Sequence, residues 1–409
     1  MPLEKPVWPI AGARRVAADF GGVYLGSAIV AFLFAASGPV AIILAVGARG
    51  GLAEEDIASW IFGAFFLNGL LSIAFSLLYR QPLVFFWTIP GAVLLGPALT
   101  HLTWPQVIGA FHATGALMLL LGLSGWVRRA MQAVPMPIVM AMVAGVFLRF
   151  GIDLVVAFRD GFWIAAPMAA AFFALTAAPR LARFLPPLIG ALAAGALAVW
   201  ALDAFRPGPG ALFALAAPNV YAPALSWRAM VELVVPLAIT VLVVQNAQGI
   251  AILSANGHQP PINAITAACG LWSSVTALVG TVSTCLTGPV NAILSSAGEK
   301  HRHYTAGMAV GVLALGFGLA APFFTRLMLA TPGAFIATLA GLAMLRVLQT
   351  AFQVSFRERF TLGALICFLV TVADVPIFNI GAAFWGLVFG LAASWLLERP
   401  DWARGRGKD

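Results

Sequence analysis

Apolar stretches follow one another along nearly the whole chain, separated by short polar segments. Most approach the roughly 20 residues that an α-helix needs to cross the hydrocarbon core of a bilayer. We expect spans at residues 20–47, 57–79, 83–100, 104–125, 135–150, 161–178 and 184–204, and again at 227–255, 263–280, 282–297, 303–324, 330–350, 360–375 and 378–397. The pattern predicts an all-α polytopic membrane protein with 14 transmembrane spans, or 12 if one pair of shorter segments does not cross.

The segment 205–226 separates the two sets of spans and is rich in Pro and Gly, as a connecting loop is. It divides the chain into a first unit at 1–204 and a second at 227–397, followed by a tail at 398–409. The first residues lack the apolar stretch and the small-residue cleavage site of a signal peptide.

Charged residues alternate between the two predicted sides of the membrane. The loops on one side contain Arg80, Arg180, Arg183, Lys300, Arg302, Arg357 and Arg359. A loop on the other side contains Glu54-Glu55-Asp56. Because Lys and Arg are retained on the cytoplasmic side, we expect the N- and C-termini both to be cytoplasmic.

Short sequence elements of the first half recur in the second half at a nearly constant offset. Arg129, Pro135 and Leu148-Arg149 recur as Arg326, Pro332 and Leu345-Arg346, and Thr88-Ile89-Pro90 recurs as Thr287-Gly288-Pro289. Such a recurrence favours an internal duplication. Since each half has an odd number of predicted spans, the two copies would be inverted across the membrane, as in many transporters.

The third and tenth spans each contain a proline where a helix could begin inside the membrane. Proline suits the first turn of a helix, so chain before Pro90 and Pro289 is expected to be extended and chain after them helical. Two half-helices would then direct positive dipole ends at one region, which favours an anion such as a carboxylate. In the alternative interpretation, both prolines only kink continuous packed helices.

Polar residues in these segments are the candidates for substrate contact. They are Trp87, Thr88, Pro90 and Gly91 in the third span, and Thr284, Cys285, Thr287, Gly288 and Asn291 in the tenth. The eighth span adds the amides of Gln245, Asn246 and Gln248, and the first span adds Ser37 beside a Gly-Pro break. Amides can donate to a carboxylate or accept from a protonated one. The alternative role for the amides is contact between helices, and for Ser37 an ordinary kink.

Composition excludes several other classes of protein. With 61% hydrophobic and 9% charged residues, the chain cannot cover a water-facing surface. The net charge of +8 is dispersed over short loops, which does not indicate nucleic acid binding. Its three cysteines lie in apolar stretches without paired spacing, so we expect neither disulfide nor metal site. No motif of a hydrolase, an ATPase or a cofactor enzyme is present.

Titratable residues are scarce within the predicted spans. Asp19, Asp153, Glu232 and Asp374 lie near predicted span ends, where a charged group commonly anchors the helix at the interface. His112 lies inside the fourth span and is therefore the candidate for a proton-linked group.

The motifs QNAQGIAIL, QPP (Gln259 to Pro261), LLYRQP, WTIPGA, GLSGW and LRFGID resemble those of the bacterial benzoate/proton symporter family, most strongly at Gln245–Pro261. The resemblance covers nearly the whole chain. It implies a fold similar to that of nucleobase–ascorbate, sulfate and bicarbonate transporters, with a 7+7 inverted repeat and a homodimer. It further implies a core domain, here 20–125 with 227–324, that moves against a gate domain, here 135–204 with 330–397. One departure lies in the tenth span, where 280–285 has hydroxyls and a thiol in place of the family's His and Asn.

The function expected from the sequence is secondary active transport of a small aromatic carboxylate, coupled to protons, in the bacterial inner membrane. A nucleobase or inorganic-anion carrier of the same fold and a channel-like anion pathway are the alternatives. No catalytic group is expected.

Overall fold

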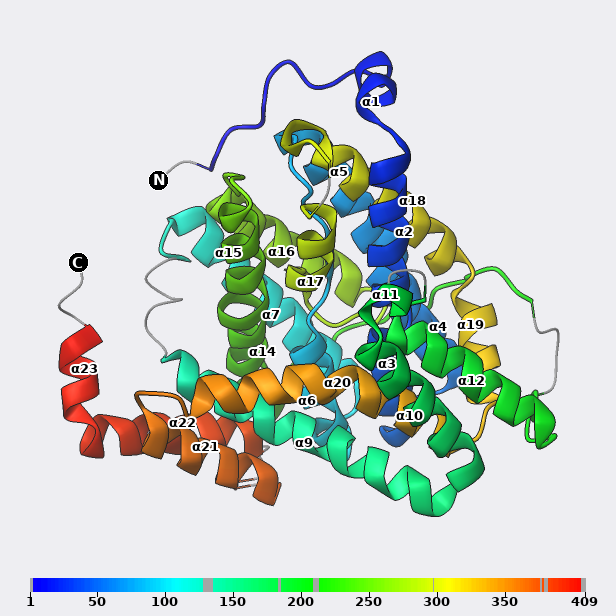
Figure 1. The fold of residues 1–409 in the computed structure, drawn as a ribbon. Coiled ribbons are helices and arrows are strands. Elements are labelled where there is room, and N and C mark those ends of the chain that lie inside the picture. The colour runs from blue at the N-terminus through cyan, green and yellow to red at the C-terminus, as the bar shows by residue number, and fades with distance from the viewer. Residues whose placement is uncertain are drawn as a thin grey trace.

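The computed structural model describes residues 3–127, 135–182, 185–208, 213–296, 298–375, 377–378 and 382–405. This part of the chain is mostly helical, and most helices pack into one bundle (Figure 1). Arg129 and Arg183, on which part of the repeat and of the charge pattern depends, lie outside the described residues, as does the end of the predicted tail.

The first half contains eleven α-helices, one π-helical stretch and one strand among the described residues. They are α1 (Ala13–Asp19), α2 (Gly22–Ala36), α3 (Gly38–Arg49), α4 (Glu54–Phe62), η1 (Gly63–Leu67), α5 (Asn68–Tyr79), β1 (Phe85–Trp87), α6 (Ile89–Ala98), α7 (Trp104–Ser124), α9 (Met136–Asp160), α10 (Phe162–Ala177), α11 (Pro179–Ala182) and α12 (Pro187–Ala201).

The second half begins with one continuous helical span that is wound more loosely at two places. Its elements are α13 (Trp227–Ala229), η2 (Met230–Val234), α14 (Val235–Ile239), η3 (Thr240–Asn246), α15 (Ala247–Ala255), α16 (Ile262–Ala277), β2 (Thr284–Leu286), α17 (Gly288–Leu294), η4 (Lys300–Arg302), α18 (His303–Leu319), α19 (Ala321–Leu329), α20 (Gly333–Ser355), α21 (Thr361–Ala373), α22 (Ala382–Leu397) and α23 (Arg399–Gly405).

Six helices of the described chain are long and apolar enough to cross a membrane, or seven if the bent pair of α18 and α19 counts as one. Five further apolar helices are shorter, α6 among them. The expected all-α architecture has one exception, because β1 and β2 form a two-stranded sheet.

Two predicted spans differ from the structure. The segment 303–324 is not one straight helix, because the chain bends by 64° between α18 and α19. Pro322 lies in the first turn of α19, which is where proline favours a new helix. The segment 135–150 is too short, because α9 continues to Asp160. Within this extension Asp153 forms ion pairs with Arg49 and Arg149. The two arginines compensate the charge of its carboxylate on the longer helix.

Small residues allow several helix pairs to approach closely. A Cβ added to Gly270 of α16 would lie 2.3 Å from the backbone nitrogen of Leu119 in α7, and one added to Gly115 would lie 2.8 Å from the carbonyl oxygen of Gly270. Gly69 and Gly311 bring α5 and α18 together in the same way. Close packing of this kind stabilises helices in an environment that supplies no hydrophobic driving force.

The connecting segment crosses the bundle without forming a helix or strand over its described residues, 205–208 and 213–226. Its backbone is held at Tyr221, which donates to Leu278, and at Ala224, which donates to Pro105. Burial, and then a hydrogen bond to Asp56, raises the pKa of Tyr221 to about 12. The phenol therefore remains a hydrogen-bond donor at neutral pH.

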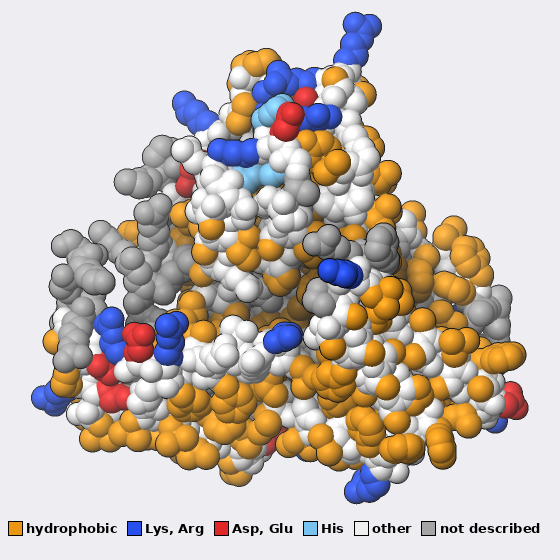
Figure 2. Space-filling view, in the orientation of Figure 1, with side chains coloured by type: hydrophobic (Ala, Val, Ile, Leu, Met, Phe, Trp, Pro, Cys, Tyr) orange, Lys and Arg blue, Asp and Glu red, His pale blue; other side chains and the backbone are white. Residues whose placement is uncertain are grey.

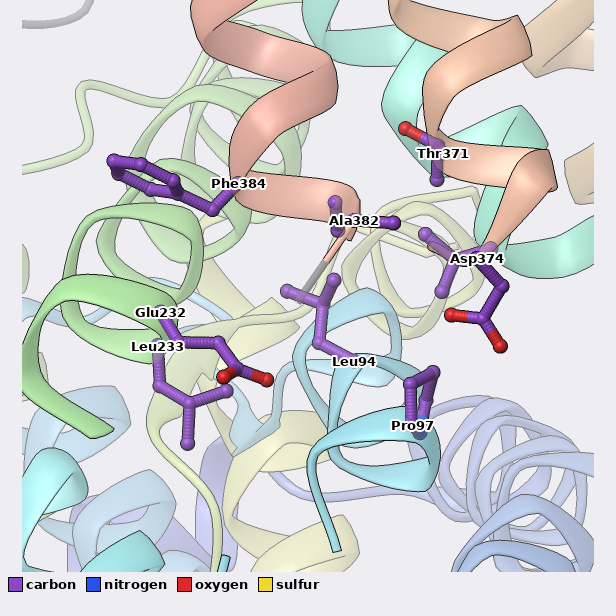
Figure 3. A pocket seen from close by; sticks show the side chains of 10 residues that line it. Leu94, Pro97, Glu232, Leu233, Thr371, Asp374, Ala382 and Phe384 are labelled. Atoms are coloured by element: carbon purple, nitrogen blue, oxygen red, sulfur yellow. The ribbon is translucent and has the colours of Figure 1, made fainter. Parts of the chain in front are cut away.

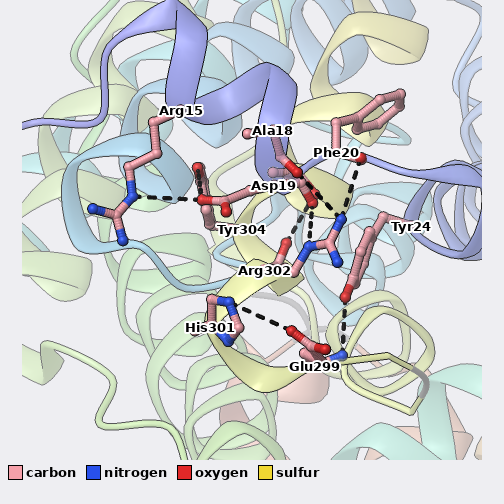
Figure 4. Close-up of polar contacts among 10 residues, drawn as sticks. Arg15, Ala18, Asp19, Phe20, Tyr24, Glu299, His301, Arg302 and Tyr304 are labelled. Atoms are coloured by element: carbon pink, nitrogen blue, oxygen red, sulfur yellow. Dashed lines mark hydrogen bonds and ion pairs between the residues drawn. The ribbon is translucent and has the colours of Figure 1, made fainter.

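Charged side chains gather at the end of the molecule where α1 and the start of α18 meet (Figure 2). Arg302 donates to the carbonyl oxygen of Asp19 at 2.7 Å, and the hydroxyl of Tyr304 donates to the Asp19 carboxylate at 2.8 Å (Figure 4). The amide of Glu299 donates to the Tyr24 hydroxyl at 2.9 Å. These contacts fix α1 and α2 to the start of α18.

Replacement of Gly270 by Ala tests the close contact between α7 and α16. The new methyl group must displace backbone, which costs about 1–3 kcal/mol in a packed interior. We therefore expect a lower thermal melting temperature of the detergent-solubilised protein. Gly316→Ala is the matched control, because no atom lies within 4 Å of its added Cβ. Equal melting temperatures for the two variants would contradict this packing.

Candidate functional site

The two strands lie side by side within the bundle, and all of their residues are buried. They pair antiparallel, with Phe85 opposite Leu286, Phe86 opposite Cys285, and Trp87 opposite Thr284. The ladder continues at both ends. Thr88 donates its N–H to the Ser283 carbonyl at 3.0 Å, and Thr287 donates to the Val84 carbonyl at 3.1 Å. The two interrupted segments thus provide hydrogen-bond partners for each other's backbone N–H and C=O groups.

Each strand leads directly into a helix. Thr88 caps α6, and its hydroxyl accepts a hydrogen bond from the N–H of Gly91 at 3.2 Å. Thr287 precedes α17 without a side-chain cap. Pro90 and Pro289 both lie in the first turn. Extended chain followed by a helix was expected at both places. The two helices start at opposite ends of the ladder, with Thr88 and Thr287 about 13 Å apart along it at roughly 3.3 Å per residue.

The eighth segment, Trp227–Ala255, packs alongside this strand pair. Its π-helical part η3 places the Thr240 hydroxyl 3.1 Å from that of Thr88. A Cβ on Gly91 would lie 3.2 Å from the same Thr240 oxygen, so glycine permits this approach. π-Helical turns inside α-helices are frequent at functional sites.

Two asparagines complete the backbone pairing of the strands. The Asn246 side-chain oxygen accepts from the N–H of Leu286 at 2.8 Å, and the Asn291 oxygen accepts from the N–H of Val84 at 3.1 Å. Both asparagines are fully buried. In this structure they position the strands, and a direct contact with a substrate stays a prediction for both.

Other predicted site residues have more varied surroundings. Thr284 donates to the Asn68 side chain at 2.8 Å, and Cys285 is fully buried. Gln248 is exposed and lies against Gly288 at the start of α17, where an added Cβ would be 2.7 Å from the Gln248 side chain. Gln245 is 8% exposed and makes no side-chain hydrogen bond within the described part of the chain.

Ser37 and His112 lie outside this arrangement. The Ser37 hydroxyl donates to the carbonyl of Phe34 at 3.2 Å, at the break between α2 and α3. His112 is half-buried on α7, which packs against α16 and η2, and its Nε2 has no hydrogen-bond partner among the described residues.

Four polar residues that support the strand pair were not predicted. Asn68 bonds Thr284, Ser72 accepts from the N–H of Phe85 at 2.8 Å, Thr240 bonds Thr88, and Ser273 accepts from the N–H of Thr284 at 2.9 Å. All four are buried polar residues within otherwise apolar helices. That was the available signal, because a buried polar side chain is normally hydrogen-bonded.

Three buried donors around the strands have no partner within the described part of the chain. They are the Trp87 indole N–H, the Ser283 hydroxyl and the Asn291 amide nitrogen. Trp87 and Ser283 are at the end of the strand pair near α6, and Asn291 is near the other end. A buried donor without a partner costs about 1–3 kcal/mol, so such donors commonly meet a ligand or water.

A cavity of about 270 Å³ lies between α6 and the helices of the opposite part of the bundle. It is lined by Ala45, Val46, Arg49, Val93, Gly96, Pro97, Thr100, Gly145, Val146, Leu148, Arg149, Phe150, Ile152, Thr371, Val372 and Asp374. A cavity of about 150 Å³ already holds benzene. Val93 is the lining residue nearest the start of α6, about one helical turn away. The residues that we predict to contact the substrate do not line this cavity.

Arginines border this cavity where α3 meets α9. Asp153 pairs with Arg49 of α3 at 2.5 Å and with Arg149 one turn earlier on α9 at 3.3 Å. One carboxylate thus faces two guanidinium groups, and Asp374 adds a second carboxylate to the lining of the cavity.

Comparison with known proteins identifies the family. A family model described as "Benzoate membrane transport protein" matches residues 18–396, nearly the entire chain. The chain belongs to this family. It is therefore a multi-pass membrane transporter of bacterial inner-membrane type and not an enzyme.

Two similar proteins agree with this family. The chain is 30% identical over 369 residues to the "Inner membrane protein YdcO" of Escherichia coli (strain K12), covering 88% of this chain and 92% of that protein. It is 26% identical over 379 residues to the "Benzoate membrane transport protein" of Acinetobacter baylyi, covering 91% and 94%.

Solved structures show the fold at low sequence identity. The transmembrane domain of a cyanobacterium bicarbonate transporter, BicA, matches with a TM-score of 0.62 and 16% identity over 93% of this chain and 99% of that one. SLC26A9 matches with a TM-score of 0.65 and 13% identity over 91% of this chain and 64% of that one. The chain thus shares its fold with these two proteins.

Replacement of Asn246 by Ala tests the role of the asparagines in the strand pair. The N–H of Leu286 would be left buried without an acceptor, so we expect destabilisation of about 1–3 kcal/mol. Thermal melting in detergent measures it, and faster hydrogen exchange at Leu286 would locate it. Asn256→Ala is the control, because that side chain is exposed and bonds only the carbonyl of Ile252. An Asn246→Ala protein as stable as this control would contradict the role.

Proposed function

We propose that this chain is a secondary active transporter that moves a small aromatic carboxylate, such as benzoate, together with protons. It acts in the inner membrane with both termini in the cytoplasm. The observation that carries the proposal is the buried strand pair, from which two helices start and around which donors lack partners. The name of the Acinetobacter baylyi relative supports the choice of substrate.

The substrate carboxylate binds between the starts of α6 and α17. The first N–H groups of a helix have no partner within the helix and carry a partial positive charge. Further donors are the indole of Trp87 and the hydroxyl of Ser283 at the α6 end of the strand pair, and the amide of Asn291 at the other end. A carboxylate accepts up to about four hydrogen bonds, so it can satisfy donors that are otherwise buried and unpaired. Gln245 and Ser37 complete the expected set.

The aromatic ring of the substrate finds apolar surroundings beside these donors. Trp87 packs against Phe65 with ring centroids 5.0 Å apart, and Phe65 packs against Phe86 at 5.2 Å. Aromatic side chains favour offset or edge contacts with a further ring. A flat acid is therefore favoured over a compact inorganic anion.

The molecule is organised as a 7+7 inverted repeat of 14 spans, with α6 and α17 as half-helices inside the membrane. Each half contains a strand that leads directly into a helix, and the two strands run antiparallel. An inverted duplication would produce this relation. The core domain consists of the segments that surround the strands, 20–125 and 227–324, and the gate domain of 135–204 and 330–397. A homodimer is part of the proposal.

Access to the site comes from movement of the core against the gate. The 270 Å³ cavity lies on this boundary, since α3 and α6 line one wall and α9 and α21 the other. Arg49 and Arg149 place two guanidinium groups in its lining, which can attract a carboxylate at low ionic strength. Substrate that binds one arrangement more tightly shifts the population toward it.

Uptake into proteoliposomes tests the proposal. Labelled benzoate should accumulate when the interior is alkaline, saturate with concentration, and stop accumulating when a protonophore is added. Protein-free liposomes control for diffusion of neutral benzoic acid through the lipid. Saturable uptake that is the same with and without the pH gradient would contradict proton coupling. If uracil or sulfate inhibits uptake and benzoate does not, the protein is instead a nucleobase or inorganic-anion carrier of this fold. Flux that does not saturate with concentration would indicate a channel.

Filling the cavity with a large side chain tests the access route. Gly96 lines the cavity and has no atom within 4 Å of an added Cβ, so Gly96→Phe can be accommodated there. We expect transport to fall about tenfold or more, since the route is blocked, with an unchanged melting temperature. Gly316→Phe, on an exposed part of α18 that is equally open, is the control. Undiminished transport by Gly96→Phe would exclude this cavity from the route.

A further inference from the structure

A buried carboxylate and an imidazole form a pair beside the core–gate boundary. Glu232 lies in η2, near the start of the eighth segment, and its side chain is only 5% exposed. Its Oε2 lies 2.8 Å from Nε2 of His101, which follows α6 and is 25% exposed. An ionisable group buried within a membrane segment is costly and is commonly functional.

The hydrogen bonds around His101 indicate which nitrogen of its ring carries a hydrogen. The Thr100 hydroxyl donates to the carbonyl oxygen of Pro97 at 2.6 Å, so its oxygen faces His101 Nδ1, 3.3 Å away, as an acceptor. Nδ1 therefore carries a hydrogen. The short contact between Nε2 and Oε2 then requires one more proton, on either the imidazole or the carboxyl group. The pair can hold this proton or lose it.

Glu232 borders a small cavity of about 30 Å³ that can hold a water molecule. Figure 3 shows the carboxyl groups of Glu232 and Asp374 turned toward the space beside Leu94 and Pro97. Val146, Thr371 and Asp374, together with Pro97, line both this cavity and the 270 Å³ cavity. The two cavities therefore adjoin, and water in the larger one can reach the pair.

The pair belongs to the proposed core, whereas much of the opposite wall belongs to the proposed gate. Leu94 and Pro97 come from α6, but Val146 comes from α9, Thr371 from α21 and Phe384 from α22. Movement of the core against the gate therefore changes the hydration of Glu232. A carboxylate surrounded by water releases its proton readily, and one enclosed by apolar side chains retains it.

Other charged and titratable groups contribute to the surroundings of Glu232. Asp374 lines the same small cavity, and Arg49, Arg149 and Asp153 lie at the adjoining larger one. Of the helices packed against η2, α13 contributes Arg228 and α7 contributes His112. α14 and α22 contribute none. Two carboxyl groups at one cavity disfavour the state in which both are ionised, which promotes proton uptake at one of them.

We infer that Glu232 and His101 together form the site that takes up and releases the coupled proton, an inference that rests on the proposed function. A proton from water in the cavity on one side of the membrane joins the pair and removes its negative charge. The carboxylate substrate binds separately at the strand pair. After the core has moved, the proton leaves to water on the other side, so one proton and one anion cross together. The sequence-based candidate His112 has no carboxylate hydrogen-bonded to it within the described chain.

The substitution Glu232→Gln separates proton coupling from substrate movement. Accumulation driven by a pH gradient requires the proton, but counterflow of labelled against unlabelled benzoate at equal pH requires no net proton movement. We expect gradient-driven accumulation to fall about tenfold or more, with counterflow within about threefold of the natural protein. Asp160→Asn is the control and should retain both activities, because that carboxylate is 53% exposed and pairs only with Arg159.

Substitution of His101 by Gln provides a second test that does not depend on the folding of the Glu232 variant. Without the imidazole, Glu232 no longer shares the proton with a second titratable group. The midpoint of the pH dependence of uptake should therefore differ between His101→Gln and the natural protein. An unchanged midpoint would contradict the assignment.

The outcomes distinguish this inference from the proposed function. If the natural protein shows neither benzoate counterflow nor gradient-driven uptake, the proposed function fails. If it shows both and Glu232→Gln still accumulates benzoate from the gradient, the proton site is elsewhere, and loss of gradient drive in His112→Gln would place it at His112. Loss of both activities in a folded Glu232→Gln protein would assign Glu232 to translocation and overturn its role as the proton carrier.

Discussion

Backbone groups that cannot reach water must find partners within the protein, and the centre of this molecule is arranged around that constraint. In hydrocarbon each unpaired backbone group costs several kcal/mol, so chain that leaves the helical conformation there needs an external partner. Here the two non-helical segments are partners of each other through β1 and β2. Where the ladder ends, side chains take over, with Asn246 bonding Leu286 and Asn291 bonding Val84.

This pairing explains how a site for an anion can exist in so apolar a chain. The strands bring the starts of α6 and α17 into the interior, where backbone N–H groups provide positive potential without a buried cation. Thr240 in the π-helical stretch η3 reaches Thr88, so the eighth segment is attached directly to one helix start. Charge is kept at a distance, with Arg49 and Arg149 at the border of the cavity and Glu232 beside His101. A carrier can thereby bind an anion in one place and a proton in another.

The sequence was sufficient for the class of protein and for most helix positions. The predicted span 227–255 coincides with the helical course Trp227–Ala255, and 104–125 differs from α7 by one residue. The family resemblance was confirmed. Two predicted boundaries differ from the structure. α9 continues past residue 150 through Asp153, whose arginine partners are apparent only in the tertiary structure. The bend before α19 lies next to Pro322, inside a segment that is apolar on both sides of it.

The site was less predictable, because polarity alone does not reveal the partner of a side chain. Asn246 was correctly recognised as unusual within a span, yet its oxygen accepts from a backbone N–H 40 residues away. Which N–H lacks a ladder partner depends on the register of two strands that are nearly 200 residues apart, and no local pattern encodes it. Likewise, Glu232 was placed at a span end, and only the tertiary structure brings it to His101.

The central claim is that the paired strands present two helix starts to one bound carboxylate. A cryo-electron microscopy map of the protein with benzoate in a lipid nanodisc tests it most directly. We expect density for the carboxylate against the first turns of α6 and α17, within hydrogen-bond distance of Trp87, Ser283 or Asn291. Benzoate bound elsewhere, with this region still closed and unoccupied at saturating concentration, would contradict the account.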